Sequence, residues 1–413
     1  MTHPSKDIKF TKSRLLKGKK IALCICGSVA AVKAPELARE LMRNGAEVFA
    51  VMTSSSQKLI SPSLLEWATG NPVVTELTGK IEHVMLGSKG GADLVLIAPA
   101  TANTIGKIAA GIDDTPVTSL ATTAIGSRIP LLVVPAMHGS MYHHPVVSEN
   151  IRKLSSLGIR IIQPEFVEDK AKFPDVSEIL EEVFATLSKK DLTGTSVIVT
   201  AGPTRSYLDS IRYLTNSSSG KMGYAFAREA HARGAKVSLI SGPTNLPPPK
   251  GIDTIFVEST EEMLDAVNRA LSKEKYHLLV MAAAPLDFAI ADRRNGKISS
   301  ESPLTFTLKP LPKIVEAARE RSKEIFIIGF KAEYGLPREE LISKARRRLL
   351  DSGMDLVVAN DLSSPFTGFQ ADTDEVYVID EKGLVLHIPL SSKREIARRV
   401  LDLYSERRGS NAS

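Results

Sequence analysis

The chain has 413 residues, of which 43% are hydrophobic and 24% charged, and its formal net charge is +6. This balance is typical of a globular protein, and the length exceeds what one hydrophobic core usually organises, so we expect two domains. No apolar run reaches about 18 residues and the basic N-terminus lacks a signal peptide's apolar stretch, so we expect a cytoplasmic protein without a membrane span. Lysines and arginines are scattered among nearly as many acids, which favours anionic small molecules over nucleic acid as partners.

The first predicted elements form a strand, a turn, a helix and a second strand between Lys19 and Thr53. The helix ends at Gly45, a residue type that often ends helices in the left-handed conformation. Cys24 and Cys26, the only cysteines, lie on the first strand. Alternate strand residues share a face, but a zinc site would still lack two ligands, so we interpret both as buried strand residues.

Further apolar runs follow along the chain, among them "ADLVLIAPA", "IPLLVVPAM", "YHLLVMAAAP" and "MDLVVAND". Runs without polar alternation are typical of strands covered on both faces, hence of parallel sheets. The strand–helix–strand pattern recurs after "ATLSKKDLTGTS", with a helix that ends at Gly234. We therefore predict two doubly wound α/β domains, at residues 1–190 and 191–413.

Small polar residues follow the strands of the first domain. Gly27 and Ser28 come directly before a helix, and Thr53 and the stretches "APATANT" and "PAMHGSMY" follow later strands. Ligands of parallel sheets bind at the carboxyl ends of strands, where helix N-termini attract phosphate. The residues fit either a phosphate site or structural turns, and the absence of G-x-G-x-x-G disfavours a dinucleotide. His83, in "KIEHVMLG", is either a surface residue or a proton-transfer group.

Together, "GSVAAVKAPELARELMRNGAEVFAVMT", "IEHVMLG", "APATANTIGKIAAGIDD" and "PAMHGSMY" make residues 18–180 resemble the flavin-dependent cysteine decarboxylase family. The resemblance implies a flavodoxin-like fold with FMN bound between the subunits of a trimer, and His83 as the catalytic base. It also places several residues around FMN or the substrate: Gly27, Ser28, Thr53, Thr101, Ala102 and Asn103.

Two positions depart from this family's pattern. His138 stands where the family has an asparagine that holds the substrate carboxylate, and a histidine can donate the same hydrogen bond. The family's flap carries a cysteine that protonates the last intermediate, whereas "PEFVEDKAKFPDVSEI" has none. Glu168, Asp169, Lys170 and water are the candidate proton donors.

The second domain contains "LTNSSSGKMGYAFA", which looks like the end of a phosphate-binding loop. A P-loop needs G-x-x-x-x-G-K-[ST], but Met222 follows the lysine and Thr215 occupies the place of the first glycine. The P-loop interpretation therefore fails. A turn rich in hydroxyls and amides that opens a helix remains a cradle for an anion.

With "VTAGPTRSYLDSIRYLTNSSSGKMG", "MAAAPLDFAIADRRNGKI", "LPKIVEAA" and "GFKAE", residues 191 to about 405 resemble the phosphopantothenate-cysteine ligase family. The resemblance implies CTP as co-substrate, an acyl-cytidylate attacked by the cysteine amine, and Mg²⁺, whose ligands no acidic cluster in the sequence identifies. It implies that Asn216 orients the intermediate, Asp287 reads the base and Lys297 binds the phosphates. Other implied nucleotide contacts are Met281, Ala282, Ala283, Pro312, Lys313, Ile314, Val315 and Phe330.

The ligase family also has two lysines on a later helix, and Arg348 and Ser352 stand at those positions. Arginine supplies a charge with different geometry, whereas serine supplies none, so Lys344 or Arg347 would compensate. From the residues alone, three structural alternatives stay open. Asp287 would be a buried or capping residue, Lys297 an exposed residue and Asn216 a turn residue.

The two halves in this order resemble the bifunctional coenzyme A biosynthesis family. That implies a flavodoxin-like first domain, a Rossmann-like second domain, and a trimer-based homo-oligomer up to a dodecamer. Its substrates would be 4'-phosphopantothenate, cysteine and CTP. Two alternatives remain: an enzyme in which only the ligase is active, and a flavin-binding regulatory subunit.

Overall fold

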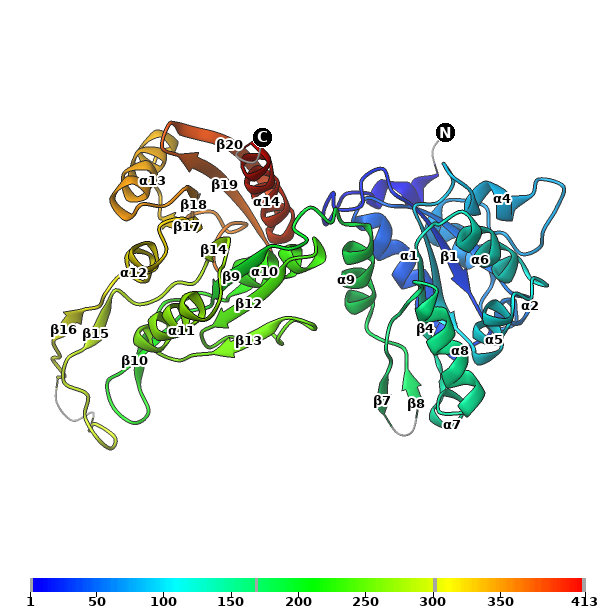
Figure 1. The fold of residues 1–413 in the computed structure, drawn as a ribbon, viewed down its shortest axis with the longest axis horizontal. Coiled ribbons are helices and arrows are strands. Elements are labelled where there is room, and N and C mark those ends of the chain that lie inside the picture. Colours follow the sequence, from blue (N-terminus) through cyan, green and yellow to red (C-terminus); the bar gives the residue numbers. More distant parts are fainter. Residues whose placement is uncertain (1–2, 168–169, 300–302, 411–413) are drawn as a thin grey trace. The chain divides into compact units, whose positions relative to one another are not determined.

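The computed structural model describes residues 3–167, 170–299 and 303–410. The chain divides into two compact units, Met1–Ser188 and Lys189–Ser413. Figure 1 shows that each unit is a sheet with helices on both faces, which confirms the predicted fold class. Within the described part of the chain, no helix is both long and apolar enough to cross a bilayer.

The sheet of the N-terminal unit is parallel throughout, with the strand order β2-β1-β3-β4-β6. This order is that of flavodoxin-like folds, whose ligands bind beyond the strand ends where the chain order reverses, here between β1 and β3. The strands are β1 (Lys20–Ile25), β2 (Glu47–Met52), β3 (Leu94–Ala100), β4 (Leu131–Pro135) and β6 (Arg160–Ile161).

The helices of this unit cover both faces of its sheet, and a small separate sheet joins three short strands. The helices are η1 (Pro4–Ile8), η2 (Val29–Lys33), α1 (Ala34–Arg43), α2 (Ser54–Gln57), α3 (Pro62–Thr69), α4 (Glu82–Gly87), α5 (Ala102–Ala110), α6 (Pro116–Gly126), α7 (Gly139–Tyr142), α8 (Pro145–Ser156) and α9 (Val176–Leu187). The small sheet has the order β5 (Met137–His138), β8 (Lys170–Lys172), β7 (Glu165–Val167).

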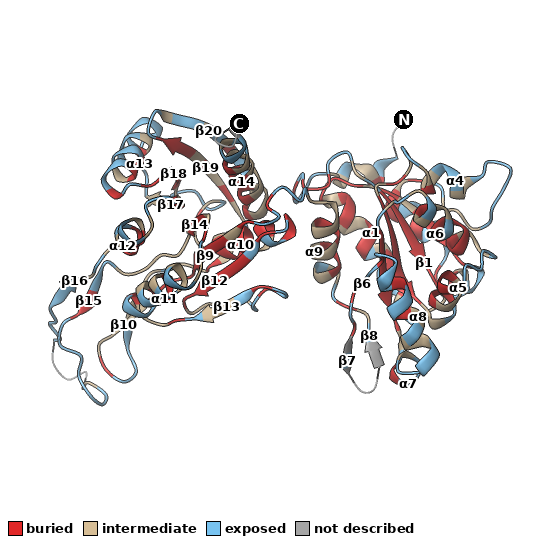
Figure 2. Ribbon diagram, in the orientation of Figure 1, coloured by how far each residue is buried: buried red, intermediate tan, exposed pale blue. Residues whose placement is uncertain are grey.

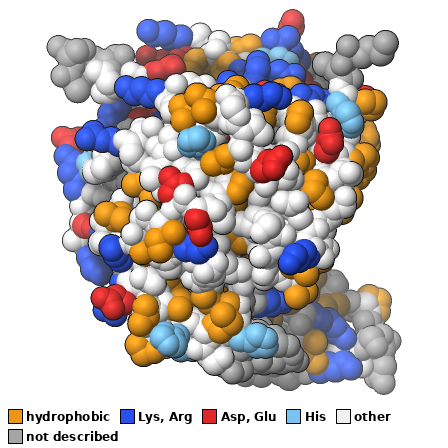
Figure 3. Space-filling view, turned by 90° about the vertical axis from the view of Figure 1, so that its right-hand side faces the viewer, with side chains coloured by type: hydrophobic (Ala, Val, Ile, Leu, Met, Phe, Trp, Pro, Cys, Tyr) orange, Lys and Arg blue, Asp and Glu red, His pale blue; other side chains and the backbone are white. Residues whose placement is uncertain are grey.

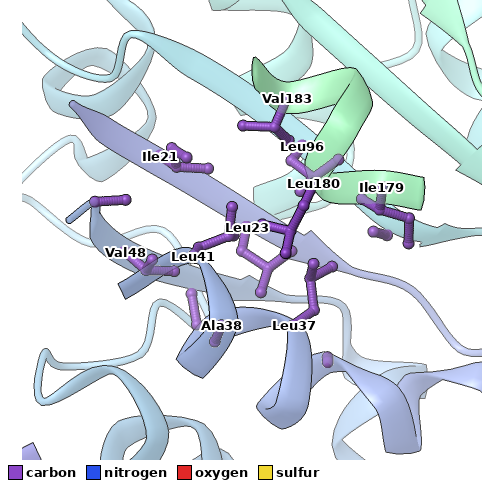
Figure 4. Close-up of a cluster of buried hydrophobic side chains, with 14 of the residues drawn as sticks. Ile21, Leu23, Leu37, Ala38, Leu41, Val48, Leu96, Ile179, Leu180 and Val183 are labelled. Carbon is purple, nitrogen blue, oxygen red and sulfur yellow. The ribbon is translucent and has the colours of Figure 1, made fainter. Parts of the chain in front are cut away.

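Alternate residues of β1 enter different hydrophobic cores. Ile21 and Leu23 pack with α1, α3 and α9, and Figure 4 shows this cluster, whereas Ala22 and Cys24 belong to the core with α5, α6 and α8. Both cysteines are free and buried, as predicted. Figure 2 shows the same arrangement in burial: the strands are buried and the outer helix faces are exposed. A strand without polar residues therefore reflects cover on both faces.

The main sheet of the C-terminal unit has the order β13-β12-β9-β14-β17-β18-β19-β20. Its first six strands are parallel in the Rossmann order, with the reversal between β9 and β14, and β19 and β20 add an antiparallel edge. The strands are β9 (Ser196–Ala201), β12 (Lys236–Ser241), β13 (Asp253–Phe256), β14 (Leu278–Met281), β17 (Phe326–Glu333), β18 (Leu356–Asp361), β19 (Thr373–Asp380) and β20 (Gly383–Ser392).

Two hairpins lie outside this sheet, and helices again cover both of its faces. The hairpins are β10 (Arg205–Tyr207) with β11 (Tyr213–Thr215), and β15 (Phe288–Ile290) with β16 (Leu308–Pro310). The helices are α10 (Lys221–Ala232), α11 (Thr260–Lys273), α12 (Ile314–Arg321), α13 (Arg338–Ser352) and α14 (Lys393–Ser410). One core contains α10 and α14, and the other contains α11, α12 and α13.

A buried arginine ties together distant segments of the C-terminal unit. Arg233, directly after α10, is 1% exposed, and its Nε donates to Asp191 Oδ1 at 2.8 Å. Its Nη1 lies 3.1 Å from Asp402 Oδ1 on α14. Because a buried charge is costly unless it is paired, the two carboxylates hold the first and last segments of the unit on this guanidinium.

Candidate functional site

Hydroxyl side chains at three strand ends cap the helices that follow. Ser28 Oγ accepts from the Ala30 amide at 3.4 Å, Thr53 Oγ1 from the Ser56 amide at 3.3 Å, and Thr101 Oγ1 from the Thr104 amide at 3.3 Å. These caps fix the loops at the carboxyl ends of β1, β2 and β3 and leave a rim rich in backbone amides. Such a rim suits a phosphate.

The loops of the rim are in close contact. The amide of Cys26 donates to the carbonyl of Pro99 at 3.2 Å, which joins the ends of β1 and β3. A Cβ on Gly27 would lie 2.5 Å from Ser55 Cβ, so the β1 and β2 loops touch where a side chain would not fit. The structure thus gathers on one rim the residues that the sequence assigned to the flavin: Gly27, Ser28, Thr53, Thr101, Ala102 and Asn103.

His83 lies on α4, away from this rim. Helix α4 packs on α6, where a Cβ on Gly87 would lie 2.9 Å from Thr123 Cβ. In Figure 1, α4 lies near the top of the N-terminal unit and α5 in its lower half. His83 Nδ1 is buried and has no hydrogen-bond partner in the described part of the chain.

Apolar side chains are exposed around His83. Ile81 is 51% exposed and Met85 64% exposed, on either side of His83 in the sequence. Figure 3 views the side of the N-terminal unit that carries α4, and shows hydrophobic side chains spread among the charged ones. Exposed apolar groups of this kind are a common feature of interaction surfaces.

His138 is exposed and is the last residue of β5, which pairs with the β7–β8 hairpin in the stretch "PEFVEDKAKFPDVSEI". Its β5 pairs antiparallel with β8, so that His138 is opposite Lys170, and β8 in turn pairs with β7. The hairpin is therefore anchored beside the end of β4. The predicted proton donors Glu168 and Asp169 lie outside the described residues, as does the side chain of Lys170.

An aromatic cluster beside this hairpin was not predicted from the sequence. Phe166 of β7 stacks on His143 with ring centroids 4.8 Å apart and meets Tyr142 edge-on at 5.3 Å. The Tyr142 hydroxyl donates to Gln163 Oε1 at 2.8 Å, and burial raises the pKa of Tyr142. The sequence features that could have indicated this cluster are the aromatic residue in "PEFVED" and the Tyr-His pair after "PAMHGSM". The cluster fixes the base of the hairpin relative to the rim.

In the C-terminal unit, two cavities adjoin the point where the strand order reverses. The larger, of about 550 Å³, is lined by residues of the β10–β11 hairpin, by Asn216 to Ser219 and by Pro243 to Leu246. The smaller, of about 180 Å³, is lined by Ala282 to Ala284, Phe330 and residues of β18 and β19. Ser218, Ser219 and Lys221 line both cavities.

Asn216 connects the serine-rich turn to the end of β14. Its Nδ2 donates to the carbonyl oxygens of Ala284 at 3.0 Å and Pro285 at 3.1 Å. The amide of Ala284 donates to the carbonyl of Gly202 at 2.9 Å, so the loops after β9 and β14 are also joined. Among the predicted nucleotide residues, Ala282, Ala283 and Phe330 line the smaller cavity, and Met281 lies next to Ala282 at the end of β14.

Asp287 and Lys313 form an ion pair, with Oδ1 and Nζ 2.5 Å apart. Asp287 is 62% exposed, so the alternative of a buried residue is wrong. Lys297 is exposed, and the amide of its neighbour Ile298 donates to Asp209 Oδ2 at 3.1 Å. Hydrogen bonds from the Arg212 and Ile211 amides lower the pKa of Asp209, which remains an anion that ties the Lys297 loop to the β10–β11 turn.

The turn that contains Pro312 and Lys313 leads into α12, and two of its residues belong to the core. Ile314 is 3% exposed and Val315 8% exposed, so their side chains pack in the interior and only their backbone is left for a ligand. Arg348 of α13 lies 3.4 Å from Glu316 in the first turn of α12, which places its guanidinium beside this turn. Ser352 is buried, so it does not stand in for a phosphate-binding lysine.

Lys221 has partners of its own in the loop before β19. Its Nζ donates to the Gln370 carbonyl at 2.7 Å and lies 2.6 Å from Asp372 Oδ1. Ser219 Oγ donates to the Phe369 carbonyl, and Gln370 Nε2 donates to the Ser217 carbonyl at 3.1 Å. The lysine that looked like part of a P-loop therefore fastens this loop to the start of α10.

Both units match known families. Residues 192–407 match the DNA/pantothenate metabolism flavoprotein C-terminal domain, and residues 9–188 match the family named Flavoprotein. Over 405 residues, 97% of this chain and 98% of the relative, the sequence is 50% identical to the coenzyme A biosynthesis bifunctional protein CoaBC of Thermococcus kodakarensis. This chain belongs to the CoaBC family.

Other CoaBC proteins are also similar over nearly the whole chain. The Methanocaldococcus jannaschii protein is 39% identical over 97% of this chain and 96% of its own length, and the Escherichia coli protein is 34% identical over 94% and 97%. A crystal structure of a CoaBC C-terminal domain is 31% identical, covers 54% of this chain and 100% of its own, and has a TM-score of 0.45. As a CoaBC family member, this chain is a bifunctional enzyme of coenzyme A biosynthesis, with a flavoprotein decarboxylase part and a ligase part.

Proposed function

We propose that the C-terminal unit joins cysteine to 4'-phosphopantothenate with CTP, and that the N-terminal unit then decarboxylates the product with FMN. The observation that carries the ligase assignment is Asn216, which bridges to Ala284 and Pro285 between the two cavities. The larger cavity has a size ordinary for a substrate pocket of roughly 300–1,000 Å³. Its position at the reversal of strand order is the usual ligand site of this topology.

For the ligase, a carboxylate is a poor electrophile until its oxygen is exchanged for a phosphate leaving group. Lys297 and Lys313 supply positive charge for the triphosphate of CTP, and Arg348 adds to it beside α12. Asp287 accepts hydrogen bonds from the nucleotide, and Ala282, Ala283 and Phe330 provide an apolar surface for it. Mg²⁺ enters with the triphosphate, since the described residues contain no group of three or more Asp, Glu, His or Cys placed to hold a metal ion.

For the decarboxylase, the capped loops around Gly27, Ser28, Thr53 and Thr101 offer the amide and hydroxyl donors that an FMN phosphate requires. The bound flavin would accept and return the electrons that allow the cysteine carboxyl to leave as carbon dioxide. His138 donates a hydrogen bond to that carboxylate, and His83 transfers the proton. Cytosol is the compartment that we propose for both reactions.

Because His83 lies away from the rim of its own unit, the flavin site is completed by a second copy of the chain. The exposed Ile81 and Met85 provide apolar surface for that contact. We therefore include a homo-oligomer built on trimers, and assembly to a dodecamer, in the proposal.

The test is to incubate the full chain with 4'-phosphopantothenate, cysteine, Mg²⁺ and one nucleotide at a time, and to identify the products by mass. With CTP we expect pyrophosphate, CMP, and a final product lighter than the amide by carbon dioxide. No amide with CTP, or equal yield without any nucleotide, contradicts the ligase assignment.

A second candidate, an enzyme in which only the ligase is active, is favoured by one observation. The two cysteines of the chain lie in or next to β1 and are completely buried, so neither can act as the flap cysteine of related decarboxylases. In the same incubation, a flavin-containing protein that accumulates the amide without loss of carbon dioxide would establish this candidate. Loss of carbon dioxide rules it out, and it also rules out a purely regulatory subunit.

A further inference from the structure

The smaller cavity of the C-terminal unit contains two buried charges that the proposed ligase mechanism has not used. Lys393, at the start of α14, is 6% exposed, and Asp374, on β19, is 2% exposed. Both line the cavity together with Asn360 and Val376. Its volume of about 180 Å³ lies below the range of roughly 300–1,000 Å³ usual for drug-sized ligands, so beside the surface of Ala282, Ala283 and Phe330 that we assign to the nucleotide it has room only for a much smaller molecule.

Each of the two charged groups has neutral hydrogen-bond partners, and the two charges also attract each other. Lys393 Nζ donates to the carbonyls of Gly368 at 2.9 Å and Phe369 at 3.2 Å. Asp374 Oδ2 accepts from Asn360 Nδ2 at 2.9 Å and Oδ1 from the Glu375 amide at 3.0 Å. Among the described residues, these contacts use two of the three lysine donors and one lone pair of each carboxylate oxygen.

Burial disfavours the charged form of both groups. It lowers the pKa of Lys393 to about 8 and raises the pKa of Asp374 to about 6. A small ligand that carries one negative and one positive group would satisfy both side chains and offset the cost of their burial.

We propose that this cavity binds the amino-acid substrate of the ligase, with its carboxylate on Lys393 and its ammonium group on Asp374. The inference rests on the proposed ligase function. The apolar side chains of Met222 and Val376, which also line the cavity, are suitable neighbours for the short thiol side chain of cysteine.

The position of the cavity agrees with the chemistry. Ser218 and Ser219 also line the larger cavity, where Asn216 is placed to orient the activated carboxyl group. Asp374 takes one proton from the ammonium group, and the freed nitrogen lone pair forms the C–N bond. The bond between the acyl carbon and the phosphate oxygen breaks, CMP leaves with that electron pair, and its phosphate takes the second proton.

The loop before β19 closes one side of this cavity. Gly368 and Phe369 belong both to the lining and to the partners of Lys393. The same loop is fastened to the start of α10 by Lys221 and Gln370. The charged groups are thus kept from bulk water, where they would discriminate poorly between similar amines.

The experiment compares the full-length wild type with Lys393→Met and Asp374→Asn. Pyrophosphate release from CTP and 4'-phosphopantothenate without cysteine reports acyl-cytidylate formation, and amide formation is followed with cysteine or with cysteamine, which lacks the carboxylate. We expect Lys393→Met to lower kcat/KM for cysteine by about 10- to 100-fold, as for loss of a charged hydrogen bond, and to change kcat/KM for cysteamine by less than about twofold. Asp374→Asn should lower kcat/KM for both amines.

Asp380→Asn is the matched control, because Asp380 is an 8% exposed carboxylate on the same strand whose partner is Arg407, outside the cavity. It should leave the cysteine-to-cysteamine ratio of the wild type unchanged. The ratio is measured within one sample, so a partly unfolded variant does not alter it. An unchanged ratio in Lys393→Met, or a rise in KM for CTP instead, overturns the inference. Absence of pyrophosphate release in the wild type would instead contradict the ligase function itself.

Discussion

Asn216, directly after β11, donates a 3.0 Å hydrogen bond from its side-chain Nδ2 to the carbonyl oxygen of Ala284, in the loop that follows β14. Asn216→Asp keeps the size of the side chain but turns the donor into an acceptor that faces two carbonyl oxygens. We expect ligase kcat/KM to fall by at least about tenfold, the cost of a lost charged or buried hydrogen bond, while decarboxylation of added phosphopantothenoylcysteine is unchanged. Asn268→Asp, on α11, should leave both activities unchanged. Equal ligase rates in the two variants would contradict the role of Asn216.

Gly27→Ala tests the rim of the N-terminal unit. The added Cβ would lie 2.5 Å from Ser55 Cβ and must push the β1 and β2 loops apart. We expect the purified variant to retain less than about half of the wild-type flavin per chain, measured by absorbance, because the phosphate donors shift. Gly126→Ala is the control, since a Cβ there meets no atom within 4 Å. Full flavin content in Gly27→Ala would place the flavin elsewhere.

His83→Asn should abolish decarboxylation, by about 100-fold or more for a lost proton-transfer group, and leave the ligase unaffected. Mixed with Gly27→Ala under conditions that exchange subunits, it should recover part of the activity, since some sites then combine an intact rim with an intact His83. The measurement is carbon dioxide release from the mixture against each variant alone. No recovery, with exchange verified by mass, would mean that His83 serves the site of its own chain.

The pKa of Asp374 predicts a pH dependence of stability. Its ordinary value of 3.8 is raised by burial to about 6, so the folded state binds the proton more tightly. Its contribution to stability is therefore full below about pH 4 and is lost as the pH rises through about 6. Asp374→Asn removes this titration. Relative to wild type, the variant should gain up to about 3 kcal/mol between about pH 4 and pH 7, at 1.36 kcal/mol per pKa unit.

The measurement is the free energy of unfolding of both proteins by calorimetry across this pH range. The difference between the two free energies cancels the contribution of groups that titrate alike in both proteins. Lys393 has a lowered pKa of about 8 that the charge of Asp374 helps to raise, so both proteins also carry Lys393→Met, which keeps its titration out of the range. A difference that stays constant with pH would show that Asp374 is not shifted.

The sequence predicted the parallel cores well, because strands such as β3 and β14 are covered on both faces and carry no polar side chains. It did not predict the edge strands β19 and β20, whose buried and exposed residues alternate under partial cover. It grouped the small polar residues after β1, β2 and β3 at one edge of the sheet, where the structure has them, since the carboxyl ends of parallel strands lie at the same edge. It missed that Ile314 and Val315 are core residues, because a motif does not show which atoms of a turn face inward.

The roles of Asp374 and Lys393 could not have been found from spacing. They lie on β19 and α14, and they meet only because β20 returns the chain across the sheet. Lys221 was noticed for its motif, yet its partners Gln370 and Asp372 are about 150 residues away in the sequence. Long-range pairs of this kind depend on the complete topology.

The pairing of Arg233 with Asp191 and Asp402 has a consequence for the order in which the protein matures. The N-terminal unit has all of its strands once residue 188 has left the ribosome and can fold early, as domains commonly do during synthesis. We expect the C-terminal unit to be completed only with α14, because until Asp402 emerges the guanidinium of Arg233 lacks one of its carboxylates. A ribosome stalled before that helix would hold a finished flavoprotein half joined to an open ligase half.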